Sequence, residues 1–269
     1  MRLVMDRLAG RIAAEFGDEV VFKGGVVLEL RLAEARATKD LDLRLVGDPD
    51  QALARIRRAG RSDLGDHLVF EVQPDPRHPT IDAEGMQYEE LRFRVQARLA
   101  GKVYGGPFGV DVAFAEPLVG EPELLSGSGI LEFAGVPPPT LRVYPLETHI
   151  AEKLHAYTMP RSPPNSRVKD LPDIALLARV RAIDAPVLRR ALRRTFEHRD
   201  VHPVPSALPE PPSSWRVPYD RLASRDRLPW SDLDAVFEAA RGFIEPALMG
   251  GTGRWDPVSW VWRTNDEKR

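Results

Sequence analysis

Two aspartates lie two residues apart in a segment where polar and apolar residues alternate. Over residues 38–46 this alternation predicts a strand with Asp40 and Asp42 on one face and leucines on the other. Two carboxylates on one strand face can coordinate a divalent cation through their oxygen atoms. The alternative is a pair of solvated acids on an edge strand, because exposed aspartates are common.

A glycine turn precedes these acids. Lys23, Gly24 and Gly25 follow the short apolar run at residues 20–22, and a helical pattern follows them. Glycines allow close backbone approach, and the free N–H groups at a helix start bind phosphate oxygens. The turn matches neither the Walker A nor the dinucleotide-binding glycine pattern, and glycine pairs also occur in loops without ligands. Together with Asp40 and Asp42, however, it describes a triphosphate beside a metal pair, as nucleotidyl transfer requires.

A third acid, Asp111, lies among apolar residues in a predicted strand at 110–114. A carboxylate in such surroundings is costly unless a cation or a hydrogen-bond donor accompanies it. Asp111 is therefore a candidate third metal ligand. The alternative is an acid at a strand end that faces water, since Pro107 and Gly109 indicate a nearby loop.

The elements that must position these residues change along the chain. The first part predicts an α/β arrangement, with helices at 1–16, 26–35 and 51–59 and strands at 20–22, 38–46, 68–72, 91–99 and 110–114. From residue 145 the patterns predict helices at 147–158, 171–181, 187–199 and 231–243. We therefore predict an α/β domain over 1–140 and a mainly helical domain over 141–269, with an extended proline-rich connector at 202–218. Trp255, Trp260 and Trp262 predict that the tail packs back onto the body.

Composition excludes several classes of protein. The 269 residues include 38 Lys and Arg against 40 Asp and Glu, so the formal charge of −2 offers no bulk attraction to nucleic acid. The absence of cysteine excludes disulfides, thiolate zinc sites and cysteine nucleophiles. The six histidines lack metal-ligand spacing, and no apolar run is long enough for a membrane span. We expect a folded cytoplasmic protein that does not enter a membrane.

Four segments, in order, resemble the AbiEii/AbiGii family of toxin nucleotidyltransferases. They are residues 22–25, 36–43, 147–154 and 167–174, and the resemblance covers roughly residues 20–180. This family supplies the toxins of type IV toxin–antitoxin pairs and is related in fold to DNA polymerase β. The resemblance thus implies an α/β (α+β) protein, with a polymerase β-like nucleotidyltransferase core built on a mixed sheet and a mainly helical C-terminal domain.

The resemblance also implies roles for individual residues. Asp40 and Asp42 would bind magnesium, Gly24 and Gly25 would hold the nucleoside triphosphate (NTP), and the helical half would complete the site. Many relatives have serine at the position of Gly25, and here Thr38 can supply the hydroxyl instead. We predict catalytic roles for Asp40, Asp42, Lys153 and Asp170, metal binding by Asp40, Asp42 and Asp111, and nucleotide binding by Lys23, Gly24, Gly25, Thr38 and Asp173.

The helical half leaves alternatives open. Lys153 lies beside the apolar stripe of its helix, where it can point toward a cleft between the domains or cover apolar surface with its stem. Asp170 could instead be the N-cap of the next helix, with Asp173 at the capping-box position. The roles of these two aspartates therefore stay open. Arg161, Arg167 and Lys169 precede that helix and could meet a triphosphate or an RNA backbone.

A basic stripe covers one side of the predicted helix at 187–199. Its arginines could track the phosphates of RNA. The alternative is an ordinary solvated face, because no aromatic residues interleave with the arginines for base stacking. The predicted RNA-binding residues are Arg189, Arg190, Arg193 and Arg194.

The predicted reaction is metal-assisted transfer of a nucleoside monophosphate from an NTP, with two Mg²⁺ ions. The resemblance implies RNA, a tRNA 3′ end, as the acceptor. The resemblance implies growth inhibition as the outcome and an antitoxin encoded nearby as a partner. One alternative is transfer to a protein or small-molecule hydroxyl. Another is a non-catalytic module that binds a nucleotide or a partner.

Overall fold

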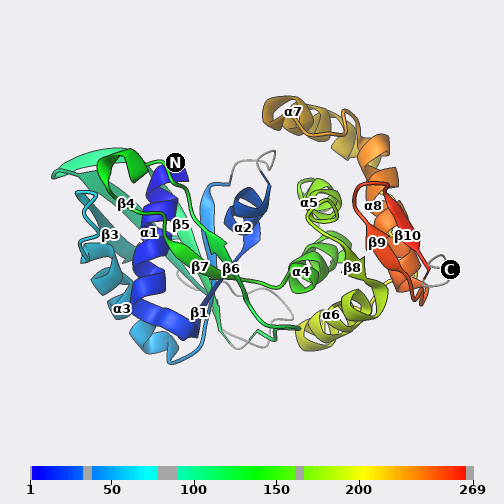
Figure 1. The fold of residues 1–269 in the computed structure, drawn as a ribbon, viewed down its shortest axis with the longest axis horizontal. Coiled ribbons are helices and arrows are strands. Elements are labelled where there is room, and N and C mark those ends of the chain that lie inside the picture. Colours follow the sequence, from blue (N-terminus) through cyan, green and yellow to red (C-terminus); the bar gives the residue numbers. More distant parts are fainter. Residues whose placement is uncertain (1, 33–37, 78–89, 115, 161–166, 265–269) are drawn as a thin grey trace. The chain divides into compact units, whose positions relative to one another are not determined.

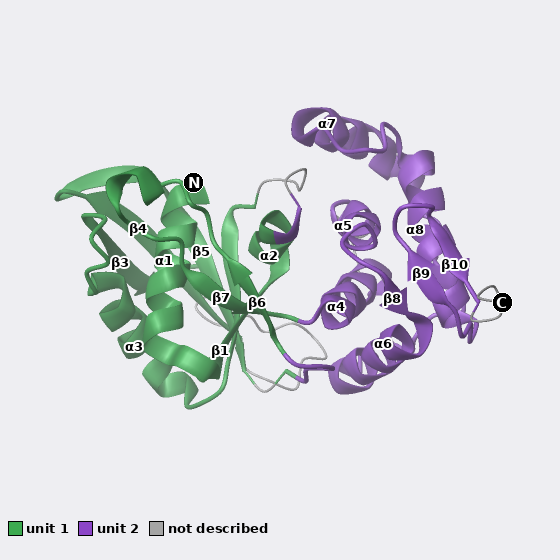
Figure 2. Ribbon diagram, viewed as in Figure 1, with its two compact units in different colours: residues 1–30, 37–116, 122–144 green, residues 31–36, 117–121, 145–269 purple. Residues whose placement is uncertain are grey.

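The computed structural model describes residues 2–32, 38–77, 90–114, 116–160 and 167–264. The chain divides into two compact units (Figure 2). Unit 1 consists of residues 1–30, 37–116 and 122–144, and unit 2 consists of residues 31–36, 117–121 and 145–269. Among the helices within these described ranges, none has the length and apolar character that a bilayer crossing requires.

Unit 1 is built on a seven-stranded mixed sheet with the order β3-β4-β5-β2-β1-β7-β6 (Figure 1). The central strand β2 is antiparallel to β1 and parallel to β5, and β1 is parallel to β7. The expected mixed sheet is therefore confirmed. The strands are β1 (Val20–Lys23), β2 (Asp40–Leu45), β3 (Leu68–Pro74), β4 (Glu90–Leu99), β5 (Lys102–Phe114), β6 (Glu123–Ser126) and β7 (Thr140–Val143).

Strict alternation along β2 divides the two faces of the sheet. Leu41, Leu43 and Leu45 are at most 2% exposed and join the core beneath α1 (Arg2–Phe16) and α3 (Pro49–Arg61). Asp40 and Asp42 lie on the opposite face, because successive side chains of a strand point to opposite sides. A third helix, α2 (Gly24–Arg31), starts directly after β1. The helix-covered face thus buries the apolar residues and leaves the other face for polar chemistry.

A buried ion network ties α1 to the loop before β3. Arg11 Nη2 lies 2.6 Å from Asp66 Oδ1, and Arg7 Nε donates to Asp66 Oδ2 at 2.7 Å. Burial would raise the pKa of Asp66, but hydrogen bonds from the two guanidinium groups lower it to about 2. The carboxylate therefore stays ionised within the packed face of unit 1.

Unit 2 is mainly helical. It contains the helices α4 (Leu146–Thr158), α5 (Asp170–Leu177), α6 (Ala185–Arg199), α7 (Arg216–Asp226) and α8 (Leu233–Leu248). The tryptophans of the tail pack onto them as expected: Trp255 is 1% exposed and donates to the carbonyl of Ala178, and Trp262 donates to that of Phe243. Satisfying the indole N–H groups in this way lets the aromatic rings be buried.

The structure differs from the sequence pattern in two places within unit 2. A three-stranded sheet joins β8 (Ile183–Asp184), β9 (Arg254–Asp256) and β10 (Val261–Arg263), where the pattern predicted no strands. Strands of two or three residues are too short to show alternation. The expected extended connector ends early, because a short helix at Ser213–Trp215 leads directly into α7.

Candidate active site

Strand register in unit 1 brings four charged residues into one row across the sheet. Lys23 on β1 pairs with Asp42 on β2, Asp42 pairs with Asp111 on β5, and Asp111 pairs with Arg92 on β4. Residues directly opposite each other in neighbouring strands share a face. We call Lys23, Asp42, Asp111 and Arg92 the charged row. Two carboxylates predicted from the sequence thus lie side by side, with a cation at each end.

The glycine turn adjoins the charged row directly. Gly24 has a φ of +67°, which favours glycine, and a Cβ at this position would lie 1.9 Å from Asp42 Oδ2. The α2 helix begins at this same glycine. Both the backbone conformation and the space taken by the Asp42 carboxylate therefore require glycine here.

Two further glycine positions hold polar side chains of the site. A Cβ on Gly25 would lie 2.6 Å from Thr38 Oγ1, so the threonine side chain occupies space that a side chain at 25 would need. The hydroxyl of Thr38 therefore lies where a side chain at position 25 would begin. In the same way, a Cβ on Gly109 would lie 2.7 Å from Asp40 Oδ1. Both metal-ligand candidates of β2 thus rest on glycine backbone.

Lys23 has a partner that the sequence pattern did not identify. Its Nζ lies 2.5 Å from Oε2 of Glu116, a residue that is 2% exposed. The hydroxyl of Tyr144, directly after β7, donates to the same oxygen at 2.5 Å. Glu116 is 93 residues from Lys23 in the chain, so no local spacing could have indicated the pair. This ion pair holds Lys23 at the entrance to the glycine turn.

Asp111 is bound on both oxygens by Arg92. Arg92 Nε donates to Oδ1 at 2.7 Å and Nη2 donates to Oδ2 at 2.6 Å, a bidentate geometry. These hydrogen bonds raise the pKa of Arg92 further, so the guanidinium stays charged. An unbroken hairpin from the Leu99–Lys102 pair would place Arg92 opposite Gly109, but an irregularity between Val95 and Ala97 shifts it to Asp111.

The carboxylates of β2 fit a divalent cation better than Asp111 does. Asp40 is exposed and Asp42 is half-buried, and both lie on the polar face of β2, where their carboxylate oxygens are of the kind that binds a divalent cation. Both carboxylate oxygens of Asp111 accept hydrogen bonds from one guanidinium. Within the described ranges, the structure contains no cluster of three or more acidic, histidine or cysteine side chains arranged to hold a metal ion. The pair Asp40 and Asp42 is therefore the metal-site candidate.

A second charged cluster lies within unit 2. Lys153 Nζ on α4 is 3.1 Å from Asp170 Oδ1 and 2.8 Å from Asp173 Oδ2, both on α5. The two aspartates are fully buried and the lysine side chain is 12% exposed. The structure thus brings Lys153 together with both of the aspartates between which the sequence left the choice open. We call Lys153, Asp170 and Asp173 the lysine cluster.

The capping alternative for Asp170 is wrong. Helix α5 begins at Asp170 itself, and its side chain forms no cap because it bonds to Lys153 instead. An ammonium is a stronger partner for a buried carboxylate than a backbone N–H group. Arg167 adds a contact of 3.6 Å to Asp170 Oδ2, whereas Arg161 lies outside the described residues.

The basic stripe on α6 is only partly available. Arg190, Arg193 and Arg194 are exposed, and Arg193 lies 3.7 Å from Glu197. Arg189 is half-buried and donates to the carbonyl of Gly251, so its guanidinium serves the packing of unit 2. The exposed part of the stripe therefore consists of three arginines, one of which has an acidic neighbour.

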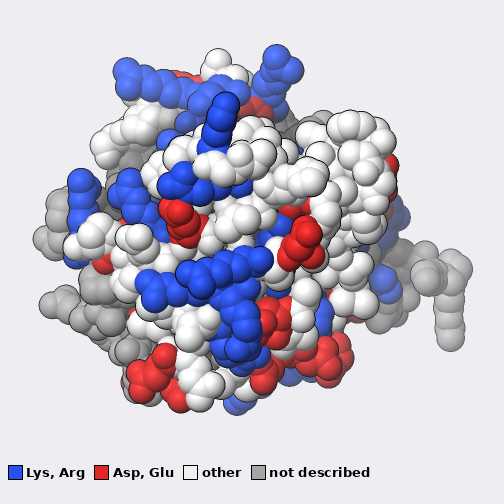
Figure 3. Space-filling view, turned by 90° about the vertical axis from the view of Figure 1, so that its left-hand side faces the viewer, with Lys and Arg blue, Asp and Glu red and all other residues white. Residues whose placement is uncertain are grey.

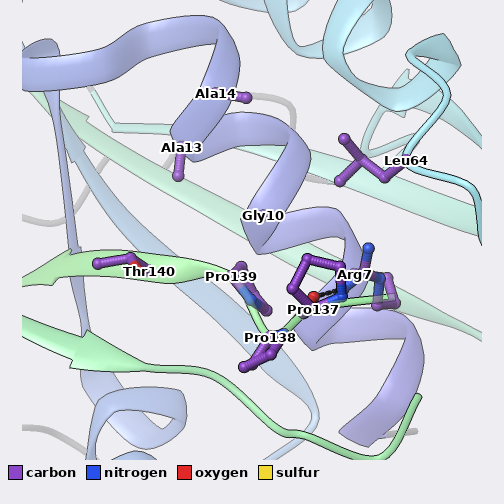
Figure 4. Close-up of a pocket in the computed structure, with 9 residues that line it drawn as sticks. All are labelled: Arg7, Gly10, Ala13, Ala14, Leu64, Pro137, Pro138, Pro139 and Thr140. Atoms are coloured by element: carbon purple, nitrogen blue, oxygen red, sulfur yellow. Dashed lines mark hydrogen bonds between the residues drawn. The ribbon is translucent and has the colours of Figure 1, made fainter. Parts of the chain in front are cut away.

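One pocket of unit 1 lies away from the carboxylates of β2. A pocket of about 360 Å³ lies between α1 and residues 137–140 (Figure 4), on the sheet face opposite the carboxylates. Its charged lining residue, Arg7, binds Asp66 and the carbonyl of Pro137. On the face shown in Figure 3, acidic side chains lie between the groups of basic ones. This face therefore presents no uniform basic field.

Comparison with known proteins identifies relatives. Residues 7–242 match the family described as nucleotidyl transferase AbiEii toxin, type IV TA system. Among solved structures, MenT4, a nucleotidyltransferase toxin from Mycobacterium tuberculosis H37Rv, is similar with a TM-score of 0.61 and 20% identity, over 100% of this chain and 88% of that one. JHP933 from Helicobacter pylori has a TM-score of 0.47 and 16% identity, over 92% and 88%. No protein of curated function matches the chain by sequence.

Proposed function

The chain belongs to the AbiEii family of type IV toxin–antitoxin nucleotidyltransferases, and from this premise we propose that it transfers a nucleoside monophosphate from an NTP to a tRNA 3′ end. The family implies an NTP substrate, a divalent metal and an antitoxin partner. We further propose two Mg²⁺ ions, a cytoplasmic location and growth inhibition as the result. The observation that carries the proposal is the contact of the Asp42 carboxylate with the glycine turn.

Unit 1 supplies the groups for NTP and metal. Asp40 and Asp42 would hold divalent cation through carboxylate oxygens, and Gly24 and Gly25 leave the backbone open to the triphosphate at the start of α2. Lys23, fixed by Glu116, keeps the turn in place. Bound Mg²⁺ would neutralise phosphate charge and favour deprotonation of the acceptor hydroxyl. Thr38 lies beside Gly25, and its hydroxyl, which here donates to the carbonyl of Asp40 at 3.3 Å, would turn to a phosphate oxygen.

Unit 2 supplies a fixed cation. Lys153 is positioned by two buried carboxylates, so its ammonium is oriented before substrate binds. In our proposal this ammonium stabilises the charge that develops on the leaving pyrophosphate. Asp170 and Asp173 act through Lys153, since both contact it.

The exposed arginines of α6 favour an RNA acceptor over a small molecule. Arg190 and Arg194 form no ion pair with any described residue, and their guanidinium groups are exposed. Neutralising phosphates with such side chains is the usual source of RNA affinity. A small-molecule acceptor would not need this surface.

The experiment is an incubation of the purified chain with Mg²⁺, each labelled NTP and total RNA, followed by a denaturing gel. Label should enter a tRNA band with the wild-type chain. Asp40→Asn and Asp42→Asn each remove a ligand charge at nearly constant volume, so transfer should fall by orders of magnitude while the fold survives.

The matched control is Asp50→Asn, an exposed aspartate in the first turn of α3, on the helix-covered side of the sheet. It should keep wild-type transfer. Label in a protein band would favour a protein hydroxyl as acceptor. Full transfer by either β2 variant would contradict the metal-site proposal, and no transfer by the wild type to any acceptor would contradict the assigned reaction.

A further inference from the structure

The ion pair between Arg92 and Asp111 occupies a position where a third metal-binding carboxylate was expected. Both oxygens of Asp111 accept hydrogen bonds from one guanidinium, at 2.7 and 2.6 Å. The Asp111 side chain is 17% exposed and that of Arg92 is 37% exposed, so water reaches the pair from the arginine side. The pair lies next to Asp42 in register, on the polar face of the sheet.

We propose that Arg92 takes the place of a cation at Asp111, so that Asp111 can bind metal only after the ion pair opens. This rests on the proposed function, because it assumes that Asp40 and Asp42 hold a divalent ion. Arg92 is then a positioning residue. It determines whether the chain without nucleotide presents two carboxylates or three to metal.

Charge explains why the structure favours the closed pair. Asp42 and Asp111 are adjacent in register, and two neighbouring carboxylates repel each other unless a cation accompanies them. Asp40 lies two residues before Asp42 on the same face of β2, and its negative charge also favours the charged form of Arg92. Three carboxylates without a cation would be strained by repulsion. The guanidinium supplies the missing charge and fixes Asp111 with bidentate geometry.

The same strand offers a matched control for charge alone. Arg94 lies two residues from Arg92 on the same face of β4 and pairs in register with Gly109, which pairs with Asp40. It is exposed and forms no ion pair with any side chain in the described ranges. Replacing Arg94 removes one positive charge near the carboxylates without freeing Asp111. An effect specific to Asp111 must therefore exceed the effect of Arg94→Gln.

The test is a Mn²⁺ titration of the purified full-length chain without nucleotide, with free Mn²⁺ measured by electron paramagnetic resonance. Wild type should bind Mn²⁺ through Asp40 and Asp42, and Asp111→Asn should leave this affinity nearly unchanged. Arg92→Gln should bind Mn²⁺ about 10-fold more tightly, or gain a second equivalent, because a third carboxylate becomes available. In the double variant Arg92→Gln/Asp111→Asn, the gain should disappear.

Arg92→Lys keeps the charge but cannot bridge both oxygens of Asp111, so it should give a smaller gain in Mn²⁺ affinity than Arg92→Gln. If circular dichroism shows that Arg92→Gln does not fold, Arg92→Lys takes its place in the test. Equal Mn²⁺ binding by Arg92→Gln and Arg94→Gln would overturn the inference. So would a loss of affinity in Asp111→Asn as large as in Asp40→Asn. If Asp40→Asn binds Mn²⁺ like the wild type, the proposed metal site itself fails, which is a distinct result.

Discussion

Replacing Lys153 tests whether the lysine cluster acts in the reaction or only in folding. Lys153→Met keeps the length of the side chain but leaves Asp170 and Asp173 buried without the ammonium. At 2.8 and 3.1 Å, and with an effective dielectric constant of about 20, the two attractions are about 6 and about 5 kcal/mol before desolvation. Breaking a buried pair on one side costs about 3–5 kcal/mol net.

The expected result is a fall in melting temperature of roughly 10 °C, measured by circular dichroism, together with loss of transfer activity. Activity loss by this variant alone cannot separate folding from catalysis. The triple variant Lys153→Met/Asp170→Asn/Asp173→Asn can, because it removes all three charges together. Buried ion networks replaced as a whole by neutral groups often keep stability. We expect it to recover to within about 2 kcal/mol of the wild type and to remain inactive.

Two results would refute this reasoning. Transfer activity in the triple variant near the wild-type level would show that the ammonium takes no part in the reaction. A melting temperature of the triple variant as low as that of Lys153→Met would show that the ion pairs themselves stabilise unit 2. Asp170→Asn and Asp173→Asn alone each leave Lys153 one carboxylate, so both should fold and both should lose turnover if they act through it.

Three further predictions concern other parts of the chain. Gly24→Ala should abolish NTP binding in a filter assay, whereas Gly17→Ala, also at positive φ but with no atom within 4 Å, should cost only about 1 kcal/mol and keep it. Because folding lowers the pKa of Asp66 to about 2, its carboxylate stabilises the fold above about pH 4, and this contribution is lost as pH falls through about 2. In urea titrations, the free energy of unfolding of Asp66→Asn should therefore change with pH by about 2–3 kcal/mol less than that of the wild type. Arg190→Ala combined with Arg194→Ala should reduce the salt dependence of tRNA binding by about two units of slope, and an unchanged slope would assign both arginines to a solvated face.

Local pattern was sufficient for the elements that carry the β2 carboxylates. Alternation with a period of two identified β2 and placed Asp40 and Asp42 on the face opposite the leucines, and burial in the structure confirms that division. The glycine turn was also evident from the sequence, as two glycines between an apolar run and a helical pattern. The structure gives the reason for glycine at position 24, which has a positive φ and lies against the Asp42 carboxylate. Such features depend on residues that are close in sequence. The family resemblance, which joins four separated segments, is confirmed by the family match over residues 7–242.

The partners of the charged side chains were beyond local pattern. Glu116 meets Lys23 across 93 residues, and Asp170 meets Lys153 across 17. The sequence predicted the helix that carries Lys153 but left capping open for Asp170, and only the packing of α4 against α5 decided between the two roles. A local donor is always a candidate partner in a sequence, but a stronger distant partner wins once the chain folds. For the same reason, Arg189 could not be separated from its exposed neighbours before its bond to Gly251 was known.

Asp111 shows most clearly which features the sequence determined and which the tertiary structure decided. Its residue type and its place in a strand were evident from the sequence, and so was the presence of a strand at 91–99. Which residue of β4 lies opposite it depended on one irregularity in the hairpin, near Gly105, Gly106 and Pro107. Strand pairing is a register between two segments, and an extra residue in one of them shifts the whole pairing beyond it. Sequence therefore marked Asp111 as an acid that either has a cation or donor partner or faces water, and the tertiary structure decided that it has a partner, Arg92.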